Sequence, residues 1–285
     1  MDKSYFIQRL NSLELPVGEY YILSSGSLLL YGLREEANDI DLCVFKELFE
    51  STLKEKYQLD DTDKNEYDFY KIAEDVEVVV NDKSDSKYKF EYDIVDGYPV
   101  QKLGIILRDK KKRNLPKDQK DIKNINNFLL KNFEICDIKN RPEFLEEVAI
   151  LTQKEWGKGK LTAKEIQDKV SKKVEKIKQN LPLRDYCKLL LIFKNELIGF
   201  ISLFPHDCPE MPELTPWYAT MFVKEEYRQM GYSKILNDAI LSEAKNRGFK
   251  RLYLKTTLNN YYEKFGAKYI KTFENGEKLM RFDIL

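Results

Sequence analysis

The stretch WYATMFVKEEYRQMGYSKIL, residues 217–236, changes from one kind of local structure to another and so restricts the fold of the second half of the chain. Its first seven residues are apolar and typical of a strand. Gly231 and Ser233 then stand inside the expected first turn of a helix that Gly248 ends. Small residues leave the unpaired amides of that turn open, and the helix dipole favours an anion there, such as a pyrophosphate. A Gly-x-Ser pair before a helix also fits an ordinary N-cap turn.

The length of 285 residues allows one large domain or two of ordinary size. Residues 1–132 read as a compact unit: a helix over residues 3–13, a strand ending at Gly26-Ser27, further strands and a helix over residues 117–133. The pattern restarts at residue 133 with the order β-α-α-β-β-β-α-β-α-β-β. We therefore predict an α/β (α+β) protein with two domains, residues 1–132 and 133–285.

The spacing Arg228-x-x-Gly231-x-Ser233 resembles the Gln/Arg-x-x-Gly-x-Gly/Ala loop of the GNAT family of N-acetyltransferases, with Ser in place of the last Gly or Ala. NNYYEKFGA, residues 259–267, resembles the family's A-x-x-x-Y-E-K-x-G-F helix, and the strand order over residues 132–285 is similar too. The resemblance implies a mixed, mostly antiparallel sheet flanked by helices and acetyl-CoA as cofactor. The cofactor-binding residues that it implies are Met221, Phe222, Val223, Arg228, Gln229, Met230, Gly231, Tyr232, Ser233, Lys234 and Asn259.

The reaction that the resemblance implies needs little from the protein: a neutral amine attacks the thioester carbonyl, and a thiolate leaves. Backbone N–H groups near Met221 and Val223 would pair with the pantetheine amides and polarise the carbonyl. Tyr262 stands at the position of the family's tyrosine and would protonate the departing sulfur, or else only anchor its helix. Tyr261 is expected to pack inward.

The base that removes a proton from the amine has several candidates. His206 stands next to Asp207, and an unperturbed imidazole titrates in the useful range, although the sequence favours a solvated loop histidine over a base. Glu213 or a chain of water molecules would serve as well. Trp217 and Tyr218 either line the acceptor pocket or belong to the core.

The first domain carries a second pattern of acids. Asp39 and Asp41 are two apart on an expected strand, so both carboxylates project from one face. Such a pair suits two divalent metal ions. Gly26-Ser27 would give backbone amides and a hydroxyl to a triphosphate. Glu77 is the candidate for a third acid, and Asp93 competes with it.

The spacing G-S-x(11)-D-I-D, beginning at Gly26, resembles the nucleotidyltransferase superfamily, and the likeness extends over residues 4–133. The segment RDKKKRNLPKDQKDIKNI, residues 108–125, is similar to the K-D-x-x-D-I tail of its small members. The resemblance implies Mg²⁺ and a nucleoside triphosphate (NTP). The superfamily usually has Asp as the third acid. The alternative that this domain is not catalytic and only binds a substrate or partner is therefore kept. The basic run 110–113 is expected to be a solvated loop.

The composition restricts the classes of ligand and binding partner that the protein can have. The 48 Lys and Arg residues balance 48 Asp and Glu residues, so no overall positive field attracts nucleic acid or an anionic membrane. One histidine excludes a metal site with several histidines. Cys43, Cys136, Cys187 and Cys208 are widely spaced, which predicts buried thiols in a reducing cytosol. With no signal peptide and no run able to cross a bilayer, we expect a cytoplasmic protein.

The two motifs together predict a two-domain enzyme whose acceptor is an amine of a small molecule, such as an aminoglycoside-like antibiotic, or of a peptide. Acetylation of such a drug requires an acidic acceptor cleft, which Asp207, Glu210 and Glu213 would provide. In one alternative, the first domain is a recognition module that delivers a protein or RNA partner to the acetyltransferase. In another, the chain is a toxin that modifies tRNA.

Overall fold

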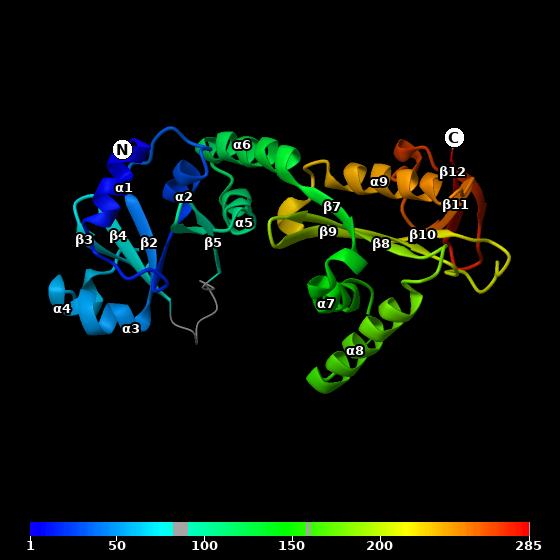
Figure 1. Cartoon of the computed structure of the whole chain (residues 1–285), viewed down its shortest axis with the longest axis horizontal. Coiled ribbons are helices and arrows are strands. Elements are labelled where there is room, and N and C mark those ends of the chain that lie inside the picture. Colours follow the sequence, from blue (N-terminus) through cyan, green and yellow to red (C-terminus); the bar gives the residue numbers. More distant parts are fainter. Residues whose placement is uncertain (82–90, 158, 160, 285) are drawn as a thin grey trace. The chain divides into compact units, whose positions relative to one another are not determined.

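A computed structural model describes residues 1–81, 91–157, 159 and 161–284. The chain forms two compact units, Met1–Phe128 and Leu129–Leu285 (Figure 1). The division falls inside helix α6 (Pro116–Asn132), close to the predicted boundary at residue 132. Each unit has a mixed sheet with helices, which confirms the predicted α/β class.

The first unit is built on a six-stranded sheet with the strand order β3-β4-β2-β1-β6-β5. Its strands are β1 (Tyr20–Ile22), β2 (Ile40–Phe45), β3 (Phe69–Ala73), β4 (Val76–Asn81), β5 (Tyr92–Val95) and β6 (Tyr98–Gln101). Its helical segments are α1 (Lys3–Asn11), α2 (Ser24–Leu30), α3 (Lys46–Leu48), η1 (Phe49–Leu53), α4 (Lys54–Lys56), η2 (Asp61–Asp63), α5 (Leu103–Arg113) and α6. β2 runs parallel to β4 and antiparallel to β1, so the centre of the sheet is mixed.

The predicted end of the first strand is wrong by several residues. The strand ends at Ile22, and Gly26 lies inside α2. A Cβ atom on Gly26 would lie 2.6 Å from Cζ of Phe6 in α1, so the glycine allows the two helices to pack closely. The sequence pattern suggested a ligand loop at a place where the fold needs close packing.

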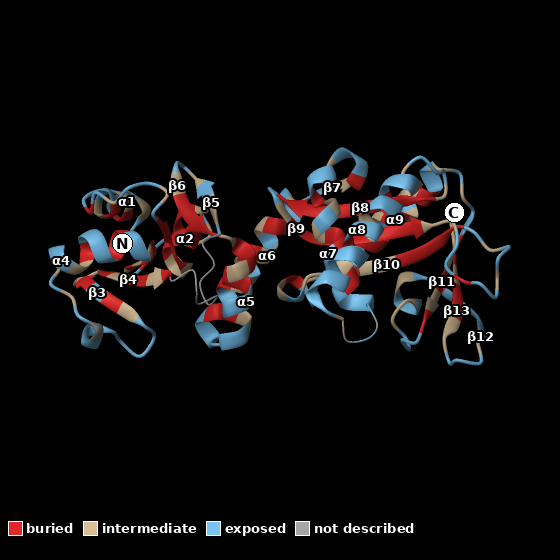
Figure 2. Cartoon of the chain, turned by 90° about the horizontal axis from the view of Figure 1, so that it is seen from below, coloured by how far each residue is buried: buried red, intermediate tan, exposed pale blue. Residues whose placement is uncertain are grey.

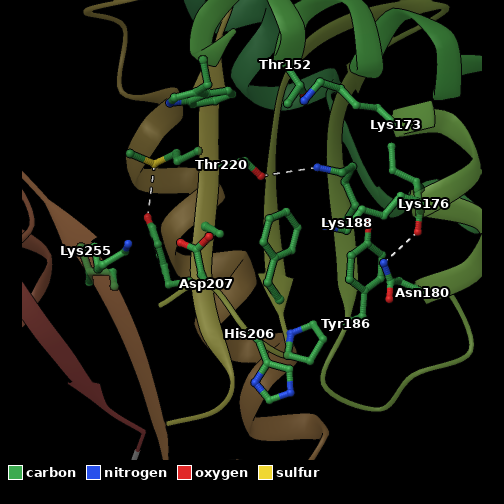
Figure 3. A pocket seen from close by; sticks show the side chains of 18 of the residues that line it. Thr152, Lys173, Lys176, Asn180, Tyr186, Lys188, His206, Asp207, Thr220 and Lys255 are labelled. Carbon is green, nitrogen blue, oxygen red and sulfur yellow. Dashed lines mark hydrogen bonds between the residues drawn. The ribbon is translucent and has the colours of Figure 1, made fainter. Parts of the chain in front are cut away.

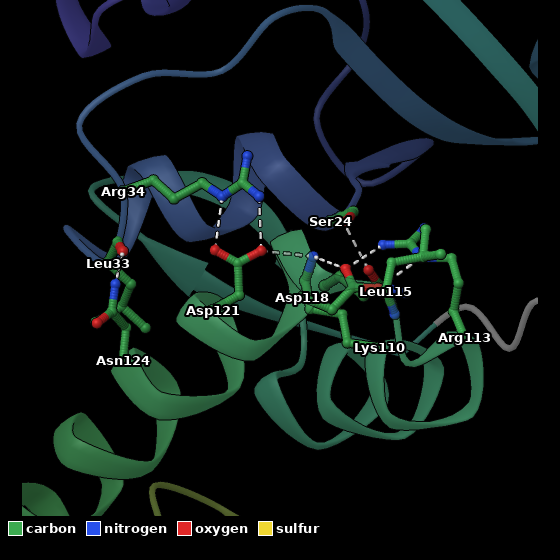
Figure 4. Close-up of polar contacts among 10 residues, drawn as sticks. Ser24, Leu33, Arg34, Lys110, Arg113, Leu115, Asp118, Asp121 and Asn124 are labelled. Atoms are coloured by element: carbon green, nitrogen blue, oxygen red, sulfur yellow. Dashed lines mark hydrogen bonds and ion pairs between the residues drawn. The ribbon is translucent and has the colours of Figure 1, made fainter.

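The basic run 110–113 is not a solvated loop, because it forms the last turn of α5. Lys110 is buried, and its Nζ lies 2.7 Å from Oδ2 of Asp121 and 3.4 Å from Oδ1 of Asp118, both on α6 (Figure 4). Arg34 forms a two-pronged bond to Asp121, at 2.8 and 2.6 Å, and Arg113 lies 2.6 Å from Asp118. The tail that resembles K-D-x-x-D-I therefore supplies two buried aspartates that join α5 and α6.

The second unit contains a seven-stranded sheet with the order β12-β13-β11-β10-β9-β8-β7. Its strands are β7 (Glu134–Asp137), β8 (Cys187–Phe193), β9 (Glu196–Phe204), β10 (Trp217–Val223), β11 (Arg251–Thr256), β12 (Lys268–Thr272) and β13 (Lys278–Asp283). Its helical segments are η3 (Ile138–Asn140), η4 (Pro142–Phe144), α7 (Leu145–Trp156), α8 (Ala163–Asn180), η5 (Glu225–Tyr227), α9 (Tyr232–Asn246) and η6 (Glu263–Phe265). α9 covers one face of the sheet, and α7 and α8 lie on the other (Figure 1).

Strand β8 is buried along its whole length, and β9 is buried except at its two ends (Figure 2). α8, by contrast, buries only Val170 and Ile177 and begins at a capping box formed by Thr162 and Glu165. Cys43, Cys187 and Cys208 are buried free thiols, as expected, and Cys136 is half-buried. Among the described helices, none has both the length and the apolar character needed to span a bilayer.

Candidate active site

The second sheet opens between β10 and β11. The two strands are parallel and share one register pair, Trp217 with Tyr253, whereas β11 pairs with β13 along its whole length from Arg251 to Thr256. Beyond Trp217, no residue of β10 has a register partner in β11. A gap of this kind admits a ligand between two strands of one sheet.

β10 also carries a bulge beside this gap. Thr220 and Met221 have no register partners in β9, since Ala219 pairs with Ser202 and Phe222 with Phe200. Thr220 has a φ of +47°, which is unusual for a β-branched residue. The bulge therefore takes the backbone of Thr220 and Met221 out of register with β9 beside the gap. Val223, the other predicted position, is back in register with β9.

A cavity of about 700 Å³ lies against the bulge (Figure 3). α7, α8, β8, β10 and β11 supply its walls. The polar side chains in its lining are Thr152, Lys173, Lys176, Asn180, Tyr186, Lys188, His206, Asp207, Tyr218, Thr220, Lys255, Tyr262 and Glu277.

The turn before α9 has the predicted open geometry. Gly231 is exposed, adopts a left-handed φ of +88°, and stands at the N-cap of α9 with no side-chain cap. Ser233 is half-buried in the first turn, and Gln229 also has a positive φ, of +66°. Tyr232, predicted to bind cofactor, buries its ring against Tyr227 with the centroids 5.9 Å apart. It can serve a ligand only through its backbone.

The other predicted cofactor residues are mostly engaged within the protein. Arg228 donates to the carbonyl of Val223 at 2.9 Å and lies 3.5 Å from Glu155. Lys234 pairs with Asp238 at 2.5 Å. The remaining positions are Phe222, buried in the core, Met230, half-buried, and Asn259, whose Oδ1 accepts a hydrogen bond from Lys278.

Tyr262 lies on the wall of the cavity, at the start of the 3₁₀ turn η6 that replaces the predicted helix. Burial, with a smaller effect of Tyr261, raises the pKa of Tyr262 to about 12. Its ring meets that of Tyr218 edge to face at 5.7 Å. Tyr262 is therefore a neutral phenol at physiological pH. Tyr261, expected to pack inward, is half-buried and contacts the ring of Phe265.

The structure distinguishes between the candidates for the general base. His206 and Asp207 line the cavity, and burial raises the pKa of Asp207. Glu213 is exposed and is not among the lining residues. Tyr218 contributes to the cavity wall, while Trp217 is fully buried in the core.

Lys188 is a cavity residue that the sequence interpretation did not single out. It is 2% exposed, and its Nζ donates to Oγ of Ser202 at 2.5 Å and to Oγ1 of Thr220 at 3.4 Å. Burial lowers the pKa of Lys188 to about 7. The available signal was a lysine inside the apolar run CKLLLIF, where an exposed position is not expected.

In the first unit, two of the predicted metal ligands are neighbours. Asp41 on β2 stands opposite Glu77 on the parallel strand β4, and Asp39 precedes the strand. Burial, then the charges of Asp39 and Glu77, raise the pKa of Asp41 to about 7. Asp93 lies on the edge strand β5 and accepts a hydrogen bond from Tyr31 at 2.7 Å. The topology thus favours Glu77 over Asp93 as the third acid.

The fit to a metal ion and a triphosphate is incomplete. Within the residues that the structure describes, no three His, Cys, Asp or Glu side chains are arranged to hold a metal ion. The Ser27 hydroxyl is fully buried; it donates to the carbonyl of Ile22 at 2.6 Å and accepts from the N–H of Gln101 at 3.0 Å. Together with the packing of Gly26, this removes the predicted phosphate cradle.

Residues 153–267 match the model of the acetyltransferase (GNAT) family, and this match contains the bulge, the turn at Gly231 and Tyr262. The chain therefore carries a GNAT acetyltransferase domain, which confirms the predicted class of enzyme, an N-acetyltransferase. The match does not extend into the first unit. No curated protein matches the chain.

Several solved structures resemble the second unit. An aminoglycoside 6'-N-acetyltransferase complexed with coenzyme A is 19% identical, with 53% of this chain and 97% of that chain covered and a TM-score of 0.42. The enzyme of that name from Enterococcus faecium is 18% identical, with the same coverage and TM-score. Ard1 from Thermoplasma volcanium is 16% identical, with 54% and 98% covered and a TM-score of 0.40. At these values the likeness decides neither the activity nor the acceptor.

Proposed function

We propose that the second unit transfers the acetyl group of acetyl-CoA to the amine of a small molecule. The observation that carries this proposal is the gap between β10 and β11, which adjoins the bulge at Thr220 and Met221 and the cavity. The uncapped turn at Gly231 fits a pyrophosphate, because its exposed glycine places no side chain in front of the first amides of α9. When bound, acetyl-CoA supplies the activated acetyl group.

The residues of the chain have separate tasks in this proposal. The amide of Met221, out of register with β9 at the bulge, points to polarisation of a carbonyl oxygen. Tyr262 holds a proton at its phenol oxygen and donates a hydrogen bond toward the departing sulfur. Because its pKa of about 12 exceeds the ~8.5 of an ordinary thiol, a full transfer of this proton is uphill. We therefore assign Tyr262 a hydrogen bond to the sulfur with partial transfer of the proton, and not a complete proton transfer.

The acceptor amine must lose a proton to become a nucleophile. His206 and Asp207 are the titratable groups of the predicted set that reach the cavity, with a chain of water molecules as the alternative. Glu213 has no place in this step, because it does not line the cavity.

The test of acetyl transfer has two readouts on the full chain: the shift of the melting temperature with acetyl-CoA, and the release of coenzyme A in the presence of primary amines. We expect acetyl-CoA to stabilise the protein and Gly231→Val to abolish that effect. A melting temperature that does not respond to acetyl-CoA at millimolar concentration would refute the proposal.

Nucleotide transfer by the first unit remains a second candidate, because Asp41 and Glu77 are register neighbours and, among the described residues, no cation forms an ion pair with either carboxylate. A divalent cation would relieve that repulsion. The missing phosphate cradle favours the alternative of a recognition module without catalysis. Mg-ATP should stabilise the wild type and not Asp41→Asn if the first candidate is correct. Equal melting temperatures with and without Mg-ATP would leave the recognition module, with a protein or RNA partner, as the function of this unit.

A further inference from the structure

The cavity of the second unit is rich in lysine. Its lining contains Lys173, Lys176, Lys188 and Lys255, against the two carboxylates of Asp207 and Glu277. The expected acidic cleft is not formed, because Glu210 and Glu213 are not among the lining residues. The lysines of this cavity would repel a polycation such as an aminoglycoside.

The positive charge is concentrated on one side of the cavity. Glu277 lies 3.7 Å from Lys255, and among its charged neighbours Asp207 interacts most strongly with Lys255 and more weakly with Lys176. In the described part of the chain, no carboxylate forms an ion pair with Lys173, Lys176 or Lys188.

Two elements hold these three lysines around a common space. Lys173 and Lys176 are three residues apart on α8 and so share a face of the helix. Lys188 projects from β8, and Figure 3 shows Lys173 and Lys188 reaching toward the same part of the cavity, near Thr152 and Thr220.

The lysines also affect one another. After burial, the charge of Lys176 is the next cause that lowers the pKa of Lys173, and Lys173 in turn lowers that of Lys188. Lys188 is buried, Lys173 is half-buried and Lys176 is exposed. Desolvated cations without an ion pair, such as Lys188 and Lys173, are costly for the folded chain unless an anion binds to them. The arrangement is therefore that of an anion subsite inside the acceptor cavity.

We propose that the acetyl acceptor is an amine that also carries a carboxylate or a phosphate, and that Lys173, Lys176 and Lys188 bind this anionic group. The inference rests on the proposed acetyl transfer and adds the chemical class of the acceptor. The same positive charge disfavours the ammonium form of the acceptor amine. The subsite thus favours loss of a proton from the acceptor amine, so a separate general base has to contribute less to this step.

Matched pairs of amines test the inference on the full chain loaded with acetyl-CoA. Binding and coenzyme A release are measured for glucosamine 6-phosphate against glucosamine, for lysine against cadaverine, and for kanamycin as a polycation. We expect the anionic member of at least one pair to bind about tenfold or more tightly than its partner, with a preference that weakens as salt rises. The two pairs separate phosphate from carboxylate as the recognised group.

Charge reversal gives the matched control. Lys176→Glu should remove the preference for the anionic member, whereas Lys172→Glu, on an exposed position of α8 outside the cavity, should keep it. Acetyl-CoA should stabilise both variants as it does the wild type. If acetyl-CoA binds but no anionic amine is preferred, or if Lys172→Glu and Lys176→Glu behave alike, the subsite is wrong while acetyl transfer stands. A failure of acetyl-CoA to bind overturns both proposals.

Discussion

The ammonium of Lys188 lies 2.5 Å from the hydroxyl of Ser202 inside a strand that is buried along its whole length. The Ser202 hydroxyl is in turn 2.6 Å from that of Thr220, on the bulge of β10. An ionisable group thus lines the cavity from a buried strand, at a position where an apolar side chain would cost less free energy. Residues that cost stability in such a place are expected to serve function.

Lys188→Met should stabilise the chain and impair its activity. The folded-state pKa of about 7 is depressed below the unfolded value of ~10.4, so the cost of Lys188 is largest below pH 7 and is lost as the pH rises through ~10. We expect a gain of ~2 kcal/mol at pH 7 that vanishes near pH 10.5, measured by urea unfolding of variant and wild type. The KM of an anionic acceptor should rise while that of acetyl-CoA stays unchanged. Lower stability of Lys188→Met at pH 7 would contradict this account.

Gly231→Ala should weaken the binding of acetyl-CoA more than it weakens the fold. A residue with a side chain at φ +88° costs ~1 kcal/mol, although the added Cβ meets no atom within 4 Å. Gly276, with φ +83° and equally open space, is the matched control in the hairpin between β12 and β13. Both variants should lose similar stability, but calorimetric titration should show about tenfold weaker acetyl-CoA binding for Gly231→Ala alone.

Sequence patterns predicted the parts of the site that depend on local structure. The small residues at Gly231 and Ser233 indicated an open first turn because that geometry is decided within a few residues. The spacing of Asp39 and Asp41 likewise indicated a shared face. Glu77, one of the two candidates for the third acid, lies on a short apolar strand and is the register partner of Asp41.

The parts that depend on distant contacts were not readable. Ser27 follows a strand in sequence, yet its hydroxyl is satisfied by Ile22 and by Gln101, which comes from another strand. The partners of Lys188 are Ser202 and Thr220, and each lies on a different strand. Only the folded sheet brings these groups together, so the residue types alone favoured the wrong role for Ser27 and indicated no role for Lys188.

Tyr262→Phe distinguishes a proton donor from an anchor. The phenylalanine ring keeps the packing against Tyr218, so a structural role alone predicts an unchanged kcat. Donation of a hydrogen bond to the sulfur predicts a loss of ~10²-fold in kcat with the KM of acetyl-CoA unchanged. Because the pKa of Tyr262 is about 12, its proton should cause no decline of activity up to pH ~10. Tyr261→Phe, which changes a neighbouring phenol, should retain wild-type kinetics.

Asp41→Asn should stabilise the first unit in alkaline and not in acidic solution. The pKa of Asp41 is about 7 in the folded chain and ~4 in the unfolded chain. The contribution of Asp41 to the free energy of unfolding is therefore most favourable below pH ~4 and is lost as the pH rises through 7. Removal of the charge should therefore add ~2 kcal/mol at pH 8 and almost nothing at pH 4. The measurement is urea unfolding at both pH values. Asp93→Asn removes a charge on the edge strand but keeps an oxygen that can accept from Tyr31, and it should show no such gain.

Asp121→Asn should destabilise the first unit far more than Lys110→Met does. The network holds buried Lys110, partly exposed Arg34 and half-exposed Arg113 against the two buried carboxylates of Asp118 and Asp121. Lys110→Met leaves two balanced pairs, Arg34 with Asp121 and Arg113 with Asp118. Asp121→Asn instead leaves three cations with one carboxylate, and a buried charge without its partner costs ~3–5 kcal/mol.

Hydrogen exchange measured by mass spectrometry locates this difference within the full chain. Amides of α5 and α6 should exchange much faster in Asp121→Asn and only slightly faster in Lys110→Met, because opening of the network separates these two helices. Burial alone would raise the pKa of Asp121, yet its bonds to Arg34 and Lys110 lower it, so the pairing outweighs the desolvation. Equal exchange rates in the two variants would show instead that packing, and not the balance of charge, holds α5 against α6.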